Sequence, residues 1–220
     1  MFSLFRPDWR GAEHLPTDQG FIAAVNHVTN LDPLTFAHFL WDNGFAPRIM
    51  AKDSLFRVPG LGRVIRDIGA IPVARGTAAA GRSLEIAAHA LADGECIAVF
   101  PEGTLTRDPD LWPMVAKTGA ARLALATGAL VVPVAQWGAH RVLGQYSAVP
   151  HLFGRKPVSL VAGPPVDLSD LTGAPRDAAT LREATTRMMA AITAQLADLR
   201  GEQPPELVFD MRSGDRTGNR

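Results

Sequence analysis

The sequence has little of several features that would settle the class of protein at once. A single cysteine among 220 residues excludes an intramolecular disulfide framework and is typical of a reducing compartment. The formal net charge is zero, so no overall field attracts nucleic acid, and any site for an anion must be local. The apolar part of the first residues is too short for a secretory signal. These absences favour a cytoplasmic protein that does not bind nucleic acid.

The sequence also lacks a long uninterrupted hydrophobic run. One segment comes close in length. Residues 123–139 carry no charge, but Gly128 and Pro133 interrupt them, and 17 residues are at the lower limit for crossing a bilayer. The segment is better interpreted as the end of a helix, a turn at Gly128 and a buried strand. The sequence therefore predicts no transmembrane helix.

Short apolar runs alternate with helical patterns along most of the chain. Helices are predicted over 78–93, 117–127 and about 180–199, the last from an apolar stripe at steps of three and four residues. Strands are predicted over 21–25, 48–51, 70–73, 96–100, 130–135 and 158–162. Their apolar residues are continuous rather than alternating, as in strands buried on both faces. This predicts a single-domain α/β layered sandwich, a largely parallel or mixed central sheet flanked by helices over residues 1–200. Residues 201–220 are polar and rich in proline and glycine, which predicts a loosely attached tail.

The first candidate for chemistry is His27, which follows the strand at 21–25 and precedes Asp32 by five positions. Histidine is the side chain best suited to act as a general base near neutral pH, and a carboxylate on its far ring nitrogen would orient it. The alternative is that Asp32 and Pro33 only begin a helix. The spacing alone leaves both interpretations open.

A second candidate is the stretch 99–108, where a strand leads into Pro-Glu-Gly-Thr. Gly103 permits close approach of the backbone to a ligand, Glu102 can accept hydrogen bonds, and Arg107 offers a planar fork for phosphate. The alternative is an ordinary glycine turn with a surface glutamate.

Basic residues at other strand ends are candidates for binding phosphate. Arg75 and Gly76 follow the predicted strand at 70–73, and Lys52 follows the strand at 48–51. Lys117 is a weaker candidate of the same kind, and a salt bridge at the rim is the alternative for Arg75. Since ligands bind beyond the carboxyl ends of parallel strands, we expect these groups to converge with His27 and Glu102.

Taken together and in this order, the motifs resemble those of the PlsC-like glycerolipid acyltransferases, the family of 1-acylglycerol-3-phosphate acyltransferases. The matching blocks are "NHVTNLD", "GAIPVARG", "FPEGT" and "VVPVA", which span residues 26–135. The resemblance implies that His27 takes a proton from a hydroxyl of a lysophospholipid or glycerol phosphate, which then attacks a fatty-acyl thioester of CoA or acyl carrier protein. It implies that Asp32 orients His27. It also implies that the acceptor is held by a set of residues that the motifs supply: Arg75, Gly76, Glu102, Gly103 and Thr104.

The resemblance implies no cofactor beyond the acyl thioester, and no second histidine at a suitable spacing indicates a metal site. Cys96 lies in an apolar strand pattern and is interpreted as packing rather than as a nucleophile. Many relatives read FPEGTRS, whereas Leu105 stands at that arginine position here and Arg107 follows two residues later. This departure alters the expected phosphate pocket.

Lipid substrates require a membrane surface, and residues 55–69 are the candidate to contact it. An apolar helical stripe there is flanked by Arg57, Arg63 and Arg66, as in helices that lie in a membrane interface. Packing of the stripe against the sheet is the alternative. We expect a peripheral protein on the inner face of the cell membrane. The other functions that remain open are acylation of a glycolipid or inositol lipid, non-catalytic binding of lipid or acyl-CoA, and thioester hydrolysis.

Overall fold

The computed structural model describes residues 5–74 and 79–218. Arg75 and Gly76 therefore lie outside the described residues. Three short 3-10 helices are η1 (Ala12–His14), η2 (Asp53–Arg57) and η3 (Ser169–Leu171). The other elements, in chain order, are β1 (Phe5–Arg10), β2 (Phe21–Val25), α1 (Asp32–Asp42), β3 (Arg48–Lys52), α2 (Leu61–Asp67), β4 (Ile71–Val73), α3 (Ala79–Ala92), β5 (Cys96–Val99), α4 (Gly119–Thr127), β6 (Leu130–Trp137), α5 (Ala139–Val142), β7 (Lys156–Ala162), α6 (Ala178–Arg200), β8 (Val208–Asp210) and β9 (Asp215–Gly218).

A central sheet of seven strands has the order β1-β7-β6-β2-β5-β3-β4. Neighbouring strands from β6 to β4 run parallel, β7 is antiparallel to β6, and β1 is parallel to β7. This confirms the predicted α/β sandwich with a largely parallel, mixed sheet flanked by helices. All six predicted strands are present. The sequence did not reveal β1, because this edge strand is polar, contains Pro7 and buries only part of its residues.

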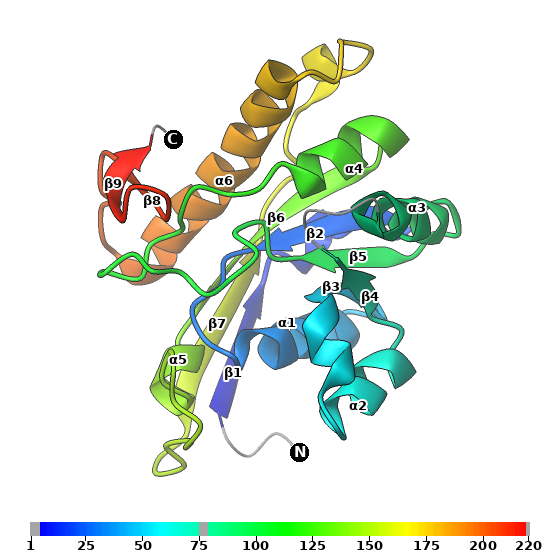
Figure 1. Ribbon diagram of the computed structural model, residues 1–220. Coiled ribbons are helices and arrows are strands. Elements are labelled where there is room, and N and C mark those ends of the chain that lie inside the picture. The colour runs from blue at the N-terminus through cyan, green and yellow to red at the C-terminus, as the bar shows by residue number, and fades with distance from the viewer. Residues whose placement is uncertain (1–4, 75–78, 219–220) are drawn as a thin grey trace.

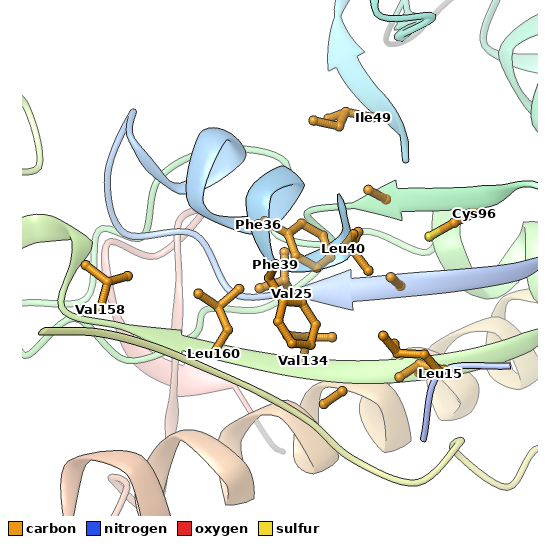
Figure 2. Close-up of a cluster of buried hydrophobic side chains, with 14 of the residues drawn as sticks. Leu15, Val25, Phe36, Phe39, Leu40, Ile49, Cys96, Val134, Val158 and Leu160 are labelled. Atoms are coloured by element: carbon orange, nitrogen blue, oxygen red, sulfur yellow. The ribbon is translucent and has the colours of Figure 1, made fainter. Parts of the chain in front are cut away.

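Helices cover both faces of the sheet, as Figure 1 shows for α1 on one side and α4 and α6 on the other. Alternate residues of β2 enter two different cores. Val25 packs in the same cluster as Phe36, Phe39 and Leu40 of α1, which Figure 2 shows gathered around it. Ile22 and Ala24 belong to the opposite cluster, which α3, α4 and α6 complete. Since side chains alternate along a strand, burial on both faces explains why β2 reads as a continuous apolar run.

The turn predicted inside residues 123–139 is present. α4 ends at Thr127, Gly128 adopts a left-handed φ of 73° as its cap, and β6 begins at Leu130. The left-handed conformation favours glycine and stops the helix before the strand. Within the described part of the chain, no helix is both long enough and apolar enough to cross a membrane.

The end of the chain differs from its prediction as a loosely attached tail. Strands β8 and β9 form an antiparallel hairpin, and the backbone N–H of Val115 donates to the carbonyl of Phe209 across 3.0 Å. Arg216 forms an ion pair with Asp108. The expectation was wrong because these contacts are made by backbone groups and charges. The low apolar content of the segment therefore did not indicate them.

Strands β2, β5 and β3 end side by side because they are parallel neighbours. Asn26 and His27 follow β2, Phe100 to Glu102 follow β5, and η2 follows β3. The sheet topology therefore brings the motif after β2, with His27, and the motif after β5, with Glu102, to one edge of the sheet. Helices η2 and α2 follow the neighbouring strand β3 at this edge.

Candidate functional site

His27 and Asp32 are in contact. The ring Nδ1 of His27 lies 3.1 Å from Oδ2 of Asp32, and the side chains are 15% and 1% exposed. Asp32 is also the first residue of α1, with Pro33 behind it. Asp32 therefore begins the helix and also directs its carboxylate back to the histidine, although its side chain makes no hydrogen bond that caps the helix.

The carboxylate of Asp32 is held by more than the histidine. The backbone N–H groups of Val28 and Thr29 both donate to the same Oδ2, the latter across 2.8 Å. A carboxylate only accepts, so the proton shared with His27 lies on Nδ1 and the lone pair of the neutral ring lies on Nε2. Among the described residues, Nε2 has no hydrogen-bond partner in the structure. The pair is thus arranged to accept a proton at Nε2.

Phe100, the residue after β5, packs against the ring of His27. The ring centroids lie 4.2 Å apart with an interplanar angle of 33°. Phe36 of α1 contacts Phe100 in turn, at 5.9 Å between centroids. The aromatic contact restricts the imidazole and shields one of its faces from water.

Glu102 is a buried group rather than the surface glutamate of the alternative interpretation. It is 2% exposed, and its two carboxyl oxygens accept from the backbone N–H groups of His27 and Met114, each across 2.9 Å. Burial raises the pKa of Glu102 to about 8, although the two backbone hydrogen bonds lower it, and the charges of Asp32 and Asp108 raise it further. Glu102 therefore joins the backbone of the histidine to the segment that follows β5.

That segment, residues 101–118, is irregular, and we call it the 101–118 loop. It begins with a turn in which the N–H of Gly103 donates to the carbonyl of Phe100, with Gly103 at a φ of 70° that favours glycine. The N–H of Thr106 then donates to the carbonyl of His27 across 2.7 Å. The loop thus binds both the N–H and the carbonyl of His27, which sets where this histidine lies.

A buried amide pair at the end of β2 was not predicted. The side chain of Asn26 bonds both the N–H and the carbonyl of Gln136, and the side chain of Gln136 donates to the carbonyl of Asn26. The hydroxyl of Thr35 donates to Gln136 Oε1 across 3.0 Å, which ties the pair to α1. An amide directly after a buried strand was the only signal of this network in the sequence.

A comparison with models of known protein families shows to which family the chain belongs. A family model described as acyltransferase matches residues 6–137, which are more than half of the chain and include His27, Asp32 and Glu102. The chain belongs to the acyltransferase family.

Named relatives support this membership. A 1-acyl-sn-glycerol-3-phosphate acyltransferase of Bacillus subtilis is 28% identical over 190 residues, which cover 85% of this chain and 84% of that protein. A protein of the same name from Borreliella burgdorferi is 34% identical over 125 residues, covering 56% of this chain and 48% of that protein. The chain thus matches about half the length of the Borreliella relative. The crystal structure of the 1-acyl-sn-glycerophosphate acyltransferase PlsC from Thermotoga maritima is similar, with a TM-score of 0.66 and 25% identity over 91% of this chain and 75% of that chain.

The remaining predicted site residues of this family member lie on the 101–118 loop and at the end of β3. Thr104 is half-buried beside Gly103, while Arg107 and Lys117 are exposed on the same loop. The backbone N–H of Lys117 donates to the carbonyl of Pro101 across 2.9 Å, which places the far end of the loop near its start. Lys52 is exposed at the end of β3, two strands from β2.

Two other residues limit the chemistry of this family member. Cys96 is buried in β5, and burial raises the pKa of its thiol, so it is unsuited to act as a nucleophile. Leu105 is only 9% exposed. At the position where many relatives carry an arginine, this chain thus has a leucine whose side chain is buried. Across residues 5–74 and 79–218, no group of three or more His, Cys, Asp or Glu residues is placed to hold a metal ion.

Proposed function

We propose that the chain transfers a fatty-acyl group from an acyl thioester to a hydroxyl of 1-acylglycerol-3-phosphate or a related glycerophospholipid, with His27 as the general base. The observation that carries the proposal is the His27–Asp32 pair, whose Nε2 is left available for a proton. The names of the Bacillus and Borreliella relatives support the choice of acceptor. The donor is acyl-CoA or acyl-acyl carrier protein.

In this reaction Nε2 of His27 takes the proton of the acceptor hydroxyl. The oxygen forms a bond to the thioester carbonyl carbon, the carbon–sulfur bond breaks, and the thiolate leaves with the proton returned from His27. Asp32 stabilises the imidazolium that forms between the two proton transfers. No protein nucleophile is needed, in agreement with the burial of Cys96.

The phosphate of the acceptor requires cations near His27. Arg107 and Lys117 are exposed on the 101–118 loop, which also contributes the backbone of Gly103 and the hydroxyl of Thr104. Lys52 offers a further charge at the same edge of the sheet. Arg75 and Gly76 complete the set through the family motif. Arginine binds phosphate through two parallel hydrogen bonds, whereas lysine acts as a point charge.

A membrane surface is the second partner in this proposal. Residues 52–68 carry four basic and two acidic side chains, a net charge of +2 in a chain whose net charge is zero. Five large apolar side chains in this stretch are exposed: Leu55, Val58, Leu61, Val64 and Ile68. Exposed apolar and basic side chains together favour binding to an anionic bilayer. The stretch follows β3 at the edge of the sheet that carries His27, so a docked lipid surface would supply the acceptor close to the base.

The rate at which lysophosphatidate is acylated by acyl-CoA tests whether His27 is the general base. His27→Ala should lower kcat on the order of 100-fold or more, because a positioned general base contributes that much. His14→Ala is the matched control, since His14 lies in η1 outside the site. Equal rates for wild type and His27→Ala would refute the assignment.

A different lipid acceptor is the second candidate, because Leu105 is buried where many relatives carry an arginine. The phosphate pocket then lacks one cation, and a glycolipid or an inositol lipid becomes a suitable acceptor. Measuring kcat/KM for these lipids and for lysophosphatidate with one acyl donor distinguishes the two. The lysophosphatidate assignment fails if another acceptor has the higher kcat/KM.

A further inference from the structure

The hairpin formed by β8 and β9, residues 208–218, lies against the 101–118 loop, and Figure 1 shows the two segments side by side. Met114 and Phe209 form an isolated parallel bridge, supported by the hydrogen bond from Val115 N–H to the carbonyl of Phe209. Arg216 donates to both oxygens of Asp108, across 2.6 and 2.7 Å, and to Asp110 across 2.7 Å. The last strand of the chain is thus joined to the loop that binds His27.

Asp108 depends on this partner. Its side chain is fully buried, and besides Arg216 it accepts from the backbone N–H groups of Asp110 and Trp112 across 2.9 and 3.3 Å. Burial raises the pKa of Asp108, but the hydrogen bonds from Arg216 and from the backbone outweigh burial, so its pKa lies below the usual value. A buried carboxylate that loses its cation is strongly unfavourable. Arg216 therefore maintains the turn that Asp108 organises.

The turn itself is strained. Leu111, between two residues that bond to Asp108, has a φ of 62°, in the left-handed region that a leucine rarely adopts. Arg200 holds the same turn from α6, because it donates to the carbonyl of Asp110 across 2.8 Å and lies over the Trp112 ring. Strained backbone persists only where surrounding contacts determine it. Without Arg216, we expect the turn to relax.

The loop packs on the end of α6 at Trp112, and a cavity lies between the rest of the loop and the earlier part of the helix. This cavity of about 510 Å³ lies between residues 113–118, α6 and β8, with Met114, Met189 and Val208 in its lining. The hairpin also lines the cavity, through Val208 and Asp210, and bonds the loop at Val115.

Two short chains of contacts connect the hairpin with the base. Phe209 bridges to Met114, whose N–H donates to Glu102, which in turn accepts from the N–H of His27. On the other side, Asp108 N–H donates to the hydroxyl of Thr106 across 3.2 Å, and Thr106 N–H donates to the carbonyl of His27.

We propose that Arg216 is a positioning residue, which holds the 101–118 loop in the conformation that binds the acceptor. The proposal rests on the proposed function, because the loop carries the acceptor groups Gly103, Thr104, Arg107 and Lys117. Arg216 acts through Asp108 and touches no reacting atom. Its loss should therefore affect acceptor binding, whereas Asp32, which lies outside the loop, continues to hold the ring of His27.

The test compares Arg216→Ala, Arg216→Lys and the control Arg212→Ala, which changes an exposed arginine of the same hairpin. Arg216→Ala should raise the KM for lysophosphatidate about 10-fold, the effect expected for a loss of binding energy that is present before the chemical step. The KM for acyl-CoA and the pH profile of kcat should stay as in wild type. Arg216→Lys keeps the charge but lacks the planar fork, so it should recover only part of the effect.

Hydrogen exchange gives a readout that does not depend on catalysis. The amides of Thr106, Asp110 and Trp112 should exchange faster in Arg216→Ala than in wild type. In Arg212→Ala their exchange rates should equal those of wild type. Adding Leu111→Asn to Arg216→Ala should restore part of the acceptor KM, because asparagine tolerates the left-handed conformation better than leucine. A general loss of stability would not be rescued in this way.

The outcomes separate the two proposals. If wild type transfers no acyl group to lysophosphatidate, the proposed function fails, while hydrogen exchange still decides whether Arg216 holds the loop. If wild type is active and Arg216→Ala matches it in both acceptor KM and exchange, the positioning role is overturned. Faster exchange with an unchanged acceptor KM overturns it as well. Should Arg216→Ala fail to fold, the same two measurements on Arg216→Lys and on Asp108→Asn decide the question.

Discussion

The backbone N–H of His27 donates to a carboxyl oxygen of Glu102 across 2.9 Å. The main chain of the candidate base is thus bonded to the side chain of the acid in the FPEGT motif, 75 positions apart. Both residues belong to the region that matches the acyltransferase family. Glu102 therefore affects where the histidine lies, and its substitution should alter stability and geometry together.

Replacing Asp32 with asparagine tests the electrostatic role of its carboxylate. Asparagine can still accept from Val28 and Thr29 N–H at the same position, so the turn should persist. It cannot stabilise the imidazolium by charge, and kcat should fall on the order of 100-fold or more. Thermal unfolding and acyl-transfer kinetics measure the two effects separately.

Asp42→Asn is the matched control for this substitution. Asp42 lies at the other end of α1, where it pairs with His38 across 3.2 Å outside the site. We expect Asp42→Asn to retain wild-type kcat. A similar loss of kcat in both variants would mean that the integrity of α1, and not the charge beside His27, is being measured.

The stability of the protein should depend on the ionisation of Glu102. Burial raises its pKa to about 8 in the folded chain, against a value of 4.5 without these effects. Between these two pH values the folded state keeps a proton that the unfolded state has lost, so stability should fall as pH rises through this window. The measurement is urea unfolding of wild type and Glu102→Gln from pH 4.5 to 8.

Glu102→Gln lacks the titrating group and serves as the reference for all other ionisations. Its amide NH₂ faces one of the two backbone N–H donors, so the variant should lose about 1–3 kcal/mol at low pH. The difference between the two proteins should shrink as pH rises. A difference that grows with pH would show that Glu102 is charged in the folded state throughout this range.

The amide pair at the end of β2 should contribute more to stability than an amide at the surface. Asn26→Leu leaves the buried N–H and carbonyl of Gln136 without their partners, which should lower the free energy of unfolding by about 3 kcal/mol. Asn43→Leu removes one half-buried hydrogen bond to Phe39 and should cost less than about 1 kcal/mol. Chemical denaturation measures both. Equal losses would contradict the role assigned to the pair.

Membrane binding is tested at Val64, which is 56% exposed on α2. Val64→Asp places a negative charge among the exposed apolar and basic side chains, so sedimentation with vesicles that contain anionic lipid should decrease several-fold. Met211→Asp, on the hairpin and far from α2 in Figure 1, is the control and should bind as wild type does. Val64→Asp with unchanged binding would exclude this surface as the contact with the bilayer.

The sequence predicted most of the elements and the central pair of residues because their causes are local. The run at 21–25 is apolar at every position, which only a strand covered on both faces explains, and the structure has β2 with the same bounds. Gly128 marked the end of a helix because few other residues adopt its conformation. The His27–Asp32 pair also depends only on a short turn and the first residue of α1.

Other features were decided only when distant segments came together. The sequence left open whether Glu102 lies at the surface, because nothing near it in the sequence indicates that it bonds to the N–H of His27. Asn26 and Gln136 are 110 positions apart, and neighbouring strands bring them together.

The attachment of the final hairpin depends on Arg216 meeting a buried Asp108 at a separation of 108 positions. Local conformational preferences and the periodicity of apolar residues are properties of short segments, so the sequence by itself determined most of the strands and helices and the proximity of His27 and Asp32. Hydrogen bonds between backbone groups and buried charges leave no periodic pattern. Only the tertiary structure therefore decided how His27 is held and which part of the chain holds it.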